Sequence, residues 1–384
     1  MGACRRAVTE QSLPPPAAAP QDPMPNASRF ALAWFLLRSL PAAAVAGWAF
    51  ERLGVPLPWM IGPLVLTAAI YVSGVAQHQI PNRMRIVGQV VVACQVGLAF
   101  SPAALQQLLV LWPYLVGSAL LSGACIFGVS WVMSRIGHMT VAQSFLSLVP
   151  TSPVEAANLA IRSGIDPMPV VVSQVMRLAL VVILVPFAMF ALDGAPTGGG
   201  RSYIALAPFA LPPVLFLAAI GAAGALAVRM IRVSNPHFLG PLAATVLLSS
   251  TGYGPQPFPD IILAGAQVIL GTWLGSNFRR DFVAKGGRLV VVSFVCTLLL
   301  LLLCGLMAVG LAQLAGHDWR VFVLGAAPGG VTEMALTAKF LGQSVALVAA
   351  FHVVRIFIFI PNIPWVVGLI DKLERRRNRP PAAS

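Results

Sequence analysis

The stretch AAPGGVTEM, residues 326–334, interrupts a long apolar run with a proline, two glycines and a glutamate. Gly329 and Gly330 weaken a helix, and a charged residue such as Glu333 costs about 2.5–3.5 kcal/mol in a membrane segment on insertion scales. These residue types predict a helix that is broken midway. Non-helical backbone at membrane depth is tolerated only where it is buried in protein or lines an aqueous cavity.

The composition of the whole chain indicates a membrane protein. Of its 384 residues, 58% are hydrophobic and 10% are charged, and the mean hydropathy is +0.84, whereas soluble domains carry about 25% charged residues. Polar residues lie between apolar runs of roughly 17–25 residues, the length that crosses a bilayer. Much of the net charge of +13 lies in short loops and at the C-terminus. The positive-inside rule explains this pattern better than nucleic-acid binding does.

The broken stretch has a weaker copy earlier in the chain. VPTSPVEAANLAIRSGID (149–166) aligns without gaps with APGGVTEMALTAKFLGQS (327–344), so that Glu155 pairs with Glu333. At the same offset in residue number, WMIGPLVLTAA (59–69) aligns with HFLGPLAATVL (237–247). A fixed offset of this kind is the signature of an internal repeat. The sequence therefore predicts two homologous halves.

These halves divide the chain into five parts. A disordered N-terminal tail is expected over 1–28, the first membrane repeat over 29–192 and a Gly-rich linker over 193–202. The second membrane repeat is expected over 203–371, followed by a basic cytoplasmic tail over 372–384.

The charges of the loops constrain the topology. The loop RRDFVAKGGR (279–288) and the tail KLERRRNR (372–379) are both basic, so both are expected in the cytoplasm. Three apolar segments lie between them, and three crossings would place them on opposite sides. One segment, the one that AAPGG breaks, is therefore expected not to span. The prediction is an all-α polytopic membrane protein of about ten transmembrane helices.

Each half then has five crossings and one broken or re-entrant segment, so the two halves are inverted relative to each other. The charge bias agrees, because the loop containing Arg83 and Arg85 is basic and its counterpart TGYGPQPFPD (251–260) is not. Inverted repeats are typical of secondary transporters. Both termini are expected in the cytoplasm.

Three motifs resemble those of a known family. GPL near the start of each half, APGGVTEM, and the following segment HVVRIFIF (352–359) resemble the AbrB family of integral membrane proteins of Gram-negative bacteria. The resemblance implies this duplication and a multi-pass protein of the inner membrane. Members of that family are labelled ammonia monooxygenases or regulators of gene expression. The first copy reads PTSPVE in place of PGGVTE, so the two halves are expected to bind differently.

Glu155 and Glu333 occupy equivalent positions in the two broken segments. An ionisable residue in a membrane segment is a candidate functional residue, and here it would bind a coupling ion or a proton. Alternatively, each glutamate forms a buried salt bridge with Arg177 or Arg355, which would hold the broken segment to its neighbour.

The breaks themselves are candidate binding elements. Each break would expose the N–H groups at the start of a half-helix, which attract anions. It would also expose carbonyl groups without a helical partner, which attract cations. A simple kink that assists packing is the alternative. The second break contributes Pro328, Gly329, Gly330 and Thr332, and the first contributes Thr151, Ser152 and Asn158.

Two polar pairs lie in the following apolar segments. Gln174 and Arg177 have the same spacing as His352 and Arg355, which places each pair on one helical face. The arginines are candidate counter-charges or anion clamps. His352 could relay protons or be a packing residue. Gln89 and Gln267 are expected to make interhelical hydrogen bonds, with contact to a substrate as the alternative.

Enzymatic activity and cofactors are not expected. A copper or iron monooxygenase needs converging His and carboxylate ligands, but the five histidines are scattered along the chain without ligand spacing. The five cysteines form no CxxC pair, so no zinc site is predicted. No nucleotide-binding motif and no domain for direct nucleic-acid binding are present.

Two functions remain. The first is a secondary carrier of a small solute or ion, whose site lies at the membrane midplane between segments 149–158 and 327–336. The second is a membrane-bound regulator that affects gene expression indirectly and without turnover. The expected partners are the lipid bilayer, an unknown small solute or ion, and a second copy of the chain in a homo-oligomer.

Overall fold

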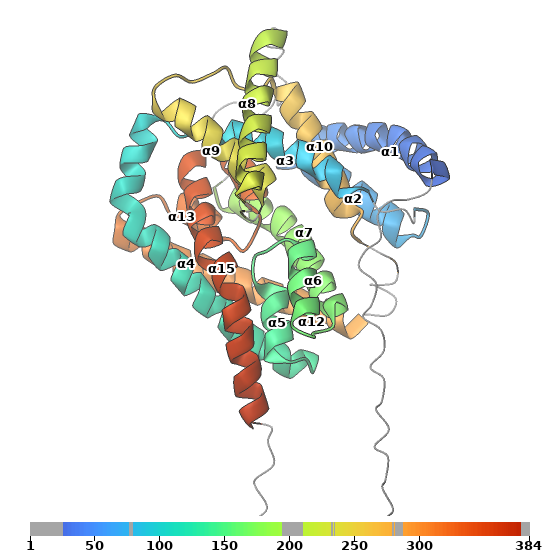
Figure 1. Ribbon diagram of the computed structural model, residues 1–384, viewed down its shortest axis with the longest axis vertical. Coiled ribbons are helices and arrows are strands. Elements are labelled where there is room, and N and C mark those ends of the chain that lie inside the picture. The colour runs from blue at the N-terminus through green and yellow to red at the C-terminus, as the bar shows by residue number, and fades with distance from the viewer. Residues whose placement is uncertain are drawn as a thin grey trace, which may run out of the picture.

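The computed structural model describes residues 26–76, 80–193, 210–231, 233, 235–278, 280 and 287–377. All regular elements within these ranges are α-helices (Figure 1). The predicted all-α polytopic membrane fold is therefore confirmed. The expected tail up to residue 25 and the linker from residue 194 lie outside the described residues.

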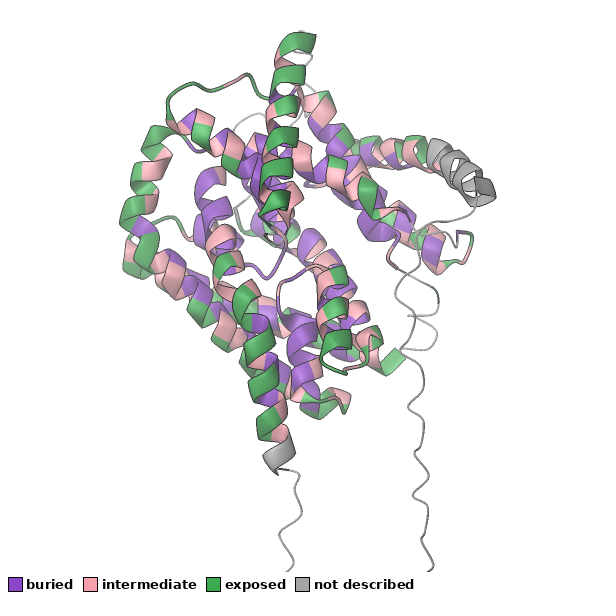
Figure 2. Ribbon diagram, viewed as in Figure 1, coloured by how far each residue is buried: buried purple, intermediate pink, exposed green. Residues whose placement is uncertain are grey.

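Five helices among the described residues are long and apolar enough to cross a bilayer. They are α4 (Pro102–Gly137), α7 (Pro167–Asp193), α8 (Leu211–Met230), α12 (Gly287–Ala315) and α15 (Val345–Arg377). Large apolar side chains on their outer faces are exposed, as expected for surfaces that face lipid (Figure 2). α15 continues through Arg377, so the first part of the expected tail is helical.

The other apolar segments form shorter helices. α1 (Asn26–Arg52) precedes α2 (Pro58–Val72) and α3 (Asn82–Gly97), and α8 precedes α9 (Pro236–Ser250) and α10 (Asp260–Gly275). The helices α2, α3, α9 and α10 have 15 or 16 residues. At about 1.5 Å per residue, a helix of this length is shorter than the hydrocarbon core of a bilayer. These four helices are therefore shorter than the full membrane crossings that the apolar runs predicted.

Both predicted breaks are present. The first separates α5 (Val141–Leu148) from α6 (Pro153–Arg162), and the second separates α13 (Trp319–Ala326) from α14 (Val331–Phe340). Proline at the first turn of α6 suits a helix start, because the missing N–H would have no partner there anyway.

The same order of helices and turns occurs twice along the chain. Four helices of the first half have counterparts in the second half that begin and end at the offset separating Glu155 from Glu333. The pairs are α2 and α9, α3 and α10, α5 and α13, and α6 and α14. The residues with left-handed backbone conformation recur at the same offset: Leu57 with Asn235, Gly74 with Gly252, His138 with Gly316, and Gly164 with Gly342.

Helices of the two halves exchange partners, since α3 packs on α9 and α10 packs on α2. Close backbone approach makes these contacts possible. A Cβ at Gly240 of α9 would contact the backbone of Gly224 in α8, and one at Gly97 of α3 would contact the Thr245 hydroxyl of α9. Small residues allow helices to approach this closely.

Gly240→Ala is therefore expected to reduce the free energy of unfolding by about 1–3 kcal/mol, because it overpacks a backbone contact. The thermal unfolding midpoint of the protein in detergent measures this effect. Gly128→Ala is the matched control, because the Cβ at Gly128 of α4 meets nothing within 4 Å. Equal midpoints for the two variants would contradict the close approach of α8 and α9.

Candidate functional site

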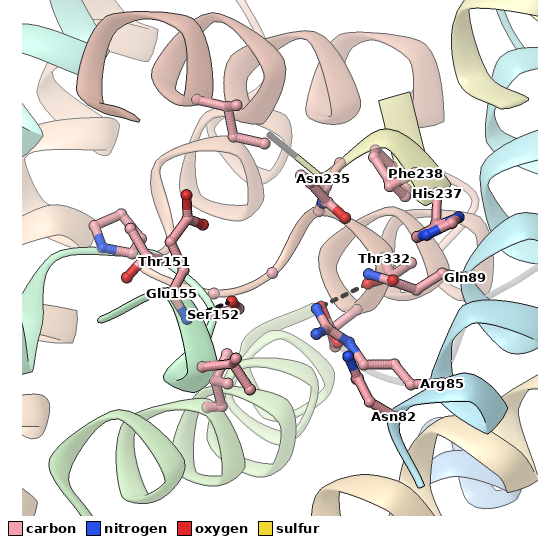
Figure 3. A pocket seen from close by; sticks show the side chains of 18 of the residues that line it. Asn82, Arg85, Gln89, Thr151, Ser152, Glu155, Asn235, His237, Phe238 and Thr332 are labelled. Atoms are coloured by element: carbon pink, nitrogen blue, oxygen red, sulfur yellow. Dashed lines mark hydrogen bonds between the residues drawn. The ribbon is translucent and has the colours of Figure 1, made fainter. Parts of the chain in front are cut away.

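The two breaks meet at one cavity of about 480 Å³, which we call the central cavity (Figure 3). Residues from the first break and from the second break both line it, although they lie far apart in the sequence. The candidate residues that line it are Thr151, Ser152, Glu155, Asn158, Arg177, Gly329, Gly330, Thr332, Glu333 and Arg355. Pro328, Gln174 and His352 do not line it.

Two half-helices begin at the central cavity. Ser152 caps α6 by accepting a hydrogen bond from the Glu155 N–H at 3.2 Å, and Glu155 lies in the first turn. This Ser and Glu spacing is that of a capping box. Gly330 caps α14 without a side-chain hydrogen bond. The positive ends of both helix dipoles are therefore at this cavity.

The Glu333 carboxylate lies against the start of its own helix. Its Oε2 accepts a hydrogen bond from the Thr332 hydroxyl at 3.0 Å. A Cβ at Gly330 would collide with the same oxygen. Glycine at position 330 thus leaves the space that the carboxylate occupies.

Arg177 of α7 joins the two breaks and is completely buried. Its guanidinium donates to the Pro328 carbonyl of the second break and to the Thr151 carbonyl of the first at 3.4 Å. It also donates to Gln174 Oε1 at 2.6 Å. The Arg177 side chain therefore donates hydrogen bonds to one carbonyl of each break, where the helix no longer supplies an N–H donor.

Arg355 of α15 makes the equivalent contacts within the second half. It donates to the Ala327 carbonyl at 2.7 Å and to the Gly329 carbonyl at 2.9 Å. The alternative of a salt bridge between each glutamate and Arg177 or Arg355 stays a prediction, whereas both arginines donate hydrogen bonds to backbone carbonyls of the breaks. The freed carbonyls of the breaks therefore accept hydrogen bonds from the buried guanidinium groups.

Gln174 and His352 lie behind the arginines. The Gln174 amide donates to the Leu146 carbonyl at 2.6 Å, and His352 Nε2 lies 3.0 Å from the Leu324 carbonyl. Arg355 has only donors, so His352 Nδ1, at 2.7 Å, accepts from it and Nε2 carries the proton. Both ring nitrogens are thus occupied, which favours the packing alternative for His352 over the proton relay.

The sequence interpretation placed Arg85 in a loop and Gln89 chiefly in a helix contact, whereas both lie on one polar face of α3. Asn82, Arg85 and Gln89 line the central cavity on the side away from the first break, and Gln89 lies beside Thr332 (Figure 3). Their spacing along a helix places them on one face, and this polar stripe in an apolar segment was the signal that could have identified them. The expected interhelical hydrogen bond of Gln89 is absent among the described residues.

The α3 side of the cavity carries further positive charge. Arg85 stacks on the Trp273 ring with 4.6 Å between its guanidinium carbon and the ring centroid. His237, in the first turn of α9 and outside the five long apolar helices, also lines the cavity. Burial, followed by the positive charges of Arg229 and Arg85, lowers the pKa of His237. His237 is therefore more strongly disposed to be neutral than an ordinary histidine.

A second cavity of about 350 Å³ lies further along α3 and α14. The central cavity is lined by the first half of α3 and the start of α14, whereas Val92, Gln95 and Val96 of α3 and Lys339 of α14 line the second cavity. Lys339 forms an ion pair at 3.7 Å with Asp260 of α10. Within the described residues, no group of three or more His, Cys, Asp or Glu could hold a metal ion.

These features define a polytopic α-helical membrane protein with a cavity at two broken helices. The chain belongs to the AbrB family: the family profile described as "Transition state regulatory protein AbrB" matches residues 8–193 and 83–371. It is similar to the "Uncharacterized protein YhjN" of Bacillus subtilis, with 26% identity over 365 residues, 89% of this chain and 93% of that protein. It is also similar to the "Putative regulator AbrB" of Escherichia coli, with 22% identity over 351 residues, 90% of this chain and 99% of that protein.

Proposed function

We propose that this protein is a secondary carrier of a small solute and that the central cavity is its binding site. The observation that carries the proposal is the meeting of two breaks at one cavity, with Arg177 donating to carbonyls of both. Carriers bind substrates and coupling ions with broken helices of this kind, at the interface between repeats. Glu155 and Glu333 would hold the coupling ion or proton.

The proposal includes an inverted internal duplication. Its support is the recurrence of helix bounds, left-handed residues and arginine contacts at one constant offset along the chain. For example, Gln174 donates to Leu146, while His352 contacts Leu324 at the equivalent position. In this account the basic loops and both termini face the cytoplasm, and the protein lies in the bacterial inner membrane.

Alternating access would use the two cavities. Leu270, Trp273 and Leu274 of α10 line the central cavity, and their counterparts in the first half, Val92, Gln95 and Val96, line the second cavity. The second cavity would then be the counterpart of the central cavity in the alternate state of the carrier. That change of state would separate Lys339, which lines the second cavity, from Asp260.

Transport by purified protein in proteoliposomes tests this function. We expect accumulation of at least one small organic acid, amine or neutral solute under a proton or sodium gradient, compared with liposomes without protein. Failure of all three classes to accumulate under either gradient would contradict the carrier.

A membrane-bound regulator without turnover is the second candidate, and the name of the Escherichia coli relative favours it. Such a protein would bind its solute in the same cavity and alter gene expression indirectly. Absence of flux, together with an expression phenotype on deletion that Glu333→Gln reproduces, would support this candidate over the carrier.

A further inference from the structure

We infer that the central cavity recognises small organic carboxylates and that Arg85 of α3 is the residue that binds the carboxylate group. This inference names the solute class of the proposed carrier and so rests on that function. Its basis is a set of hydrogen-bond donors in the cavity that have no acceptor among the described residues.

Arg85 is the first of these donors. Its guanidinium makes no hydrogen bond within the part of the chain that the structure describes, and Glu333 and Glu155 of the same cavity attract it only through their charge. Stacking on the Trp273 ring holds the guanidinium plane and leaves its N–H groups unused. A planar guanidinium binds a carboxylate through two parallel hydrogen bonds.

Gln89 is the second donor. Its side chain lines the cavity one helical turn from Arg85 and is only 6% exposed (Figure 3). Its amide has no hydrogen-bond partner in the described chain. The amide is therefore available to donate a hydrogen bond to a ligand in the cavity.

The start of α14 supplies a third attraction for an anion. Gly330 provides no side-chain cap, and Thr332, in the first turn, lines the cavity beside Gln89 (Figure 3). The dipole of α14 adds positive potential at this end, which the Glu333 carboxylate in the first turn partly offsets. The carboxylate would therefore lie between α3 and the first turn of α14.

The rest of the cavity suits an organic group. Ile86, Phe238, Leu270 and Ile356 form apolar parts of its wall. Its volume of about 480 Å³ lies within the range of small-molecule sites. Glu155 and Glu333 offset the arginines, so the site is suited to a ligand of low net negative charge rather than to a polyanion.

Ligand binding to the purified protein in detergent tests the inference. The probes are succinate and benzoate, each with its neutral amide, together with inorganic phosphate and methylammonium. We expect at least one carboxylate to raise the unfolding midpoint, while its amide, phosphate and methylammonium do not. Arg85→Gln should weaken carboxylate binding at least tenfold, the loss expected when a charge-assisted pair is removed.

Two further variants make the test specific. Arg83→Gln should bind as the wild type does, because Arg83 is exposed on the same helix and does not line the cavity. Arg85→Lys keeps the charge but loses the planar fork, so binding should be weakened there as well. Both variants must retain the wild-type unfolding midpoint without ligand.

Several results would overturn the inference: no carboxylate binding, equal binding of the amides, binding of phosphate or methylammonium alone, or carboxylate binding that Arg85→Gln leaves intact. Flux of an amine or a neutral solute without carboxylate binding would overturn this inference and leave the carrier standing. Carboxylate binding without any flux would overturn the carrier and support the inference.

Discussion

Arg177→Met is expected to reduce the free energy of unfolding by about 3 kcal/mol or more, because each buried acceptor left without a donor costs about 1–3 kcal/mol. Three acceptors depend on this side chain: the carbonyls of Pro328 and Thr151, and Gln174 Oε1. Methionine fills similar apolar volume but offers no donor. The unfolding midpoint in detergent, and the half-life of the folded protein at a fixed temperature, measure the loss.

Arg162→Met is the matched control for this variant. Arg162 lies at the end of α6 and is exposed, so its loss should change stability by less than about 1 kcal/mol. If Arg177→Met is as stable as Arg162→Met, the two breaks are not held together by this guanidinium.

Glu333→Gln is expected to reduce solute flux at least tenfold while leaving stability nearly unchanged. Glutamine has the shape of glutamate and still accepts a hydrogen bond from Thr332, but it cannot carry a coupling charge or release a proton. A carboxylate in a membrane segment is retained for such functions. Initial rates in proteoliposomes, normalised to the amount of reconstituted protein, measure the effect.

Gly330→Ala tests the position of the same carboxylate. Its Cβ would collide with Glu333 Oε2, so the carboxylate must move and flux should fall although the charge is kept. Gly310→Ala is the control, because a Cβ there, on α12, meets nothing within 4 Å.

Full flux in both Glu333→Gln and Glu155→Gln would show that neither carboxylate is needed at the proposed site.

The breaks and their glutamates could be predicted from the sequence because their signals are local. Proline, glycine and glutamate in an apolar run are unfavourable for a continuous membrane helix wherever they occur. The constant offset between the two halves then located the second break, because the same kind of segment recurs at the equivalent position. Together these signals identify the residues of both breaks that line the central cavity.

The partners of Arg177 and Arg355 could not be predicted in the same way. The sequence shows charges, and opposite charges suggest ion pairs, but it does not show carbonyls that a break leaves without a helical N–H. Arg177 contacts Pro328 across the two halves, although the two residues lie far apart in the sequence. Only the packing of α7 beside the second break brings these groups together.

The position of Arg85 and Gln89 on one cavity-lining face was missed for a related reason. Their polar spacing on α3 could have indicated a face, but a polar face can equally contact another helix. The exchange of partners between halves, with α3 packed on α9 of the other half, decides that this face lines the cavity. Such long-range packing has no local sequence signal.

Cysteine accessibility tests most directly the central claim that the two breaks line one solute site. Ser152→Cys and Thr332→Cys, each in a background without native cysteines, would be labelled with a maleimide in purified protein. The same transported solute should slow the labelling of both, because both positions line the central cavity. Protection of only one cysteine, or of neither, would contradict a shared site.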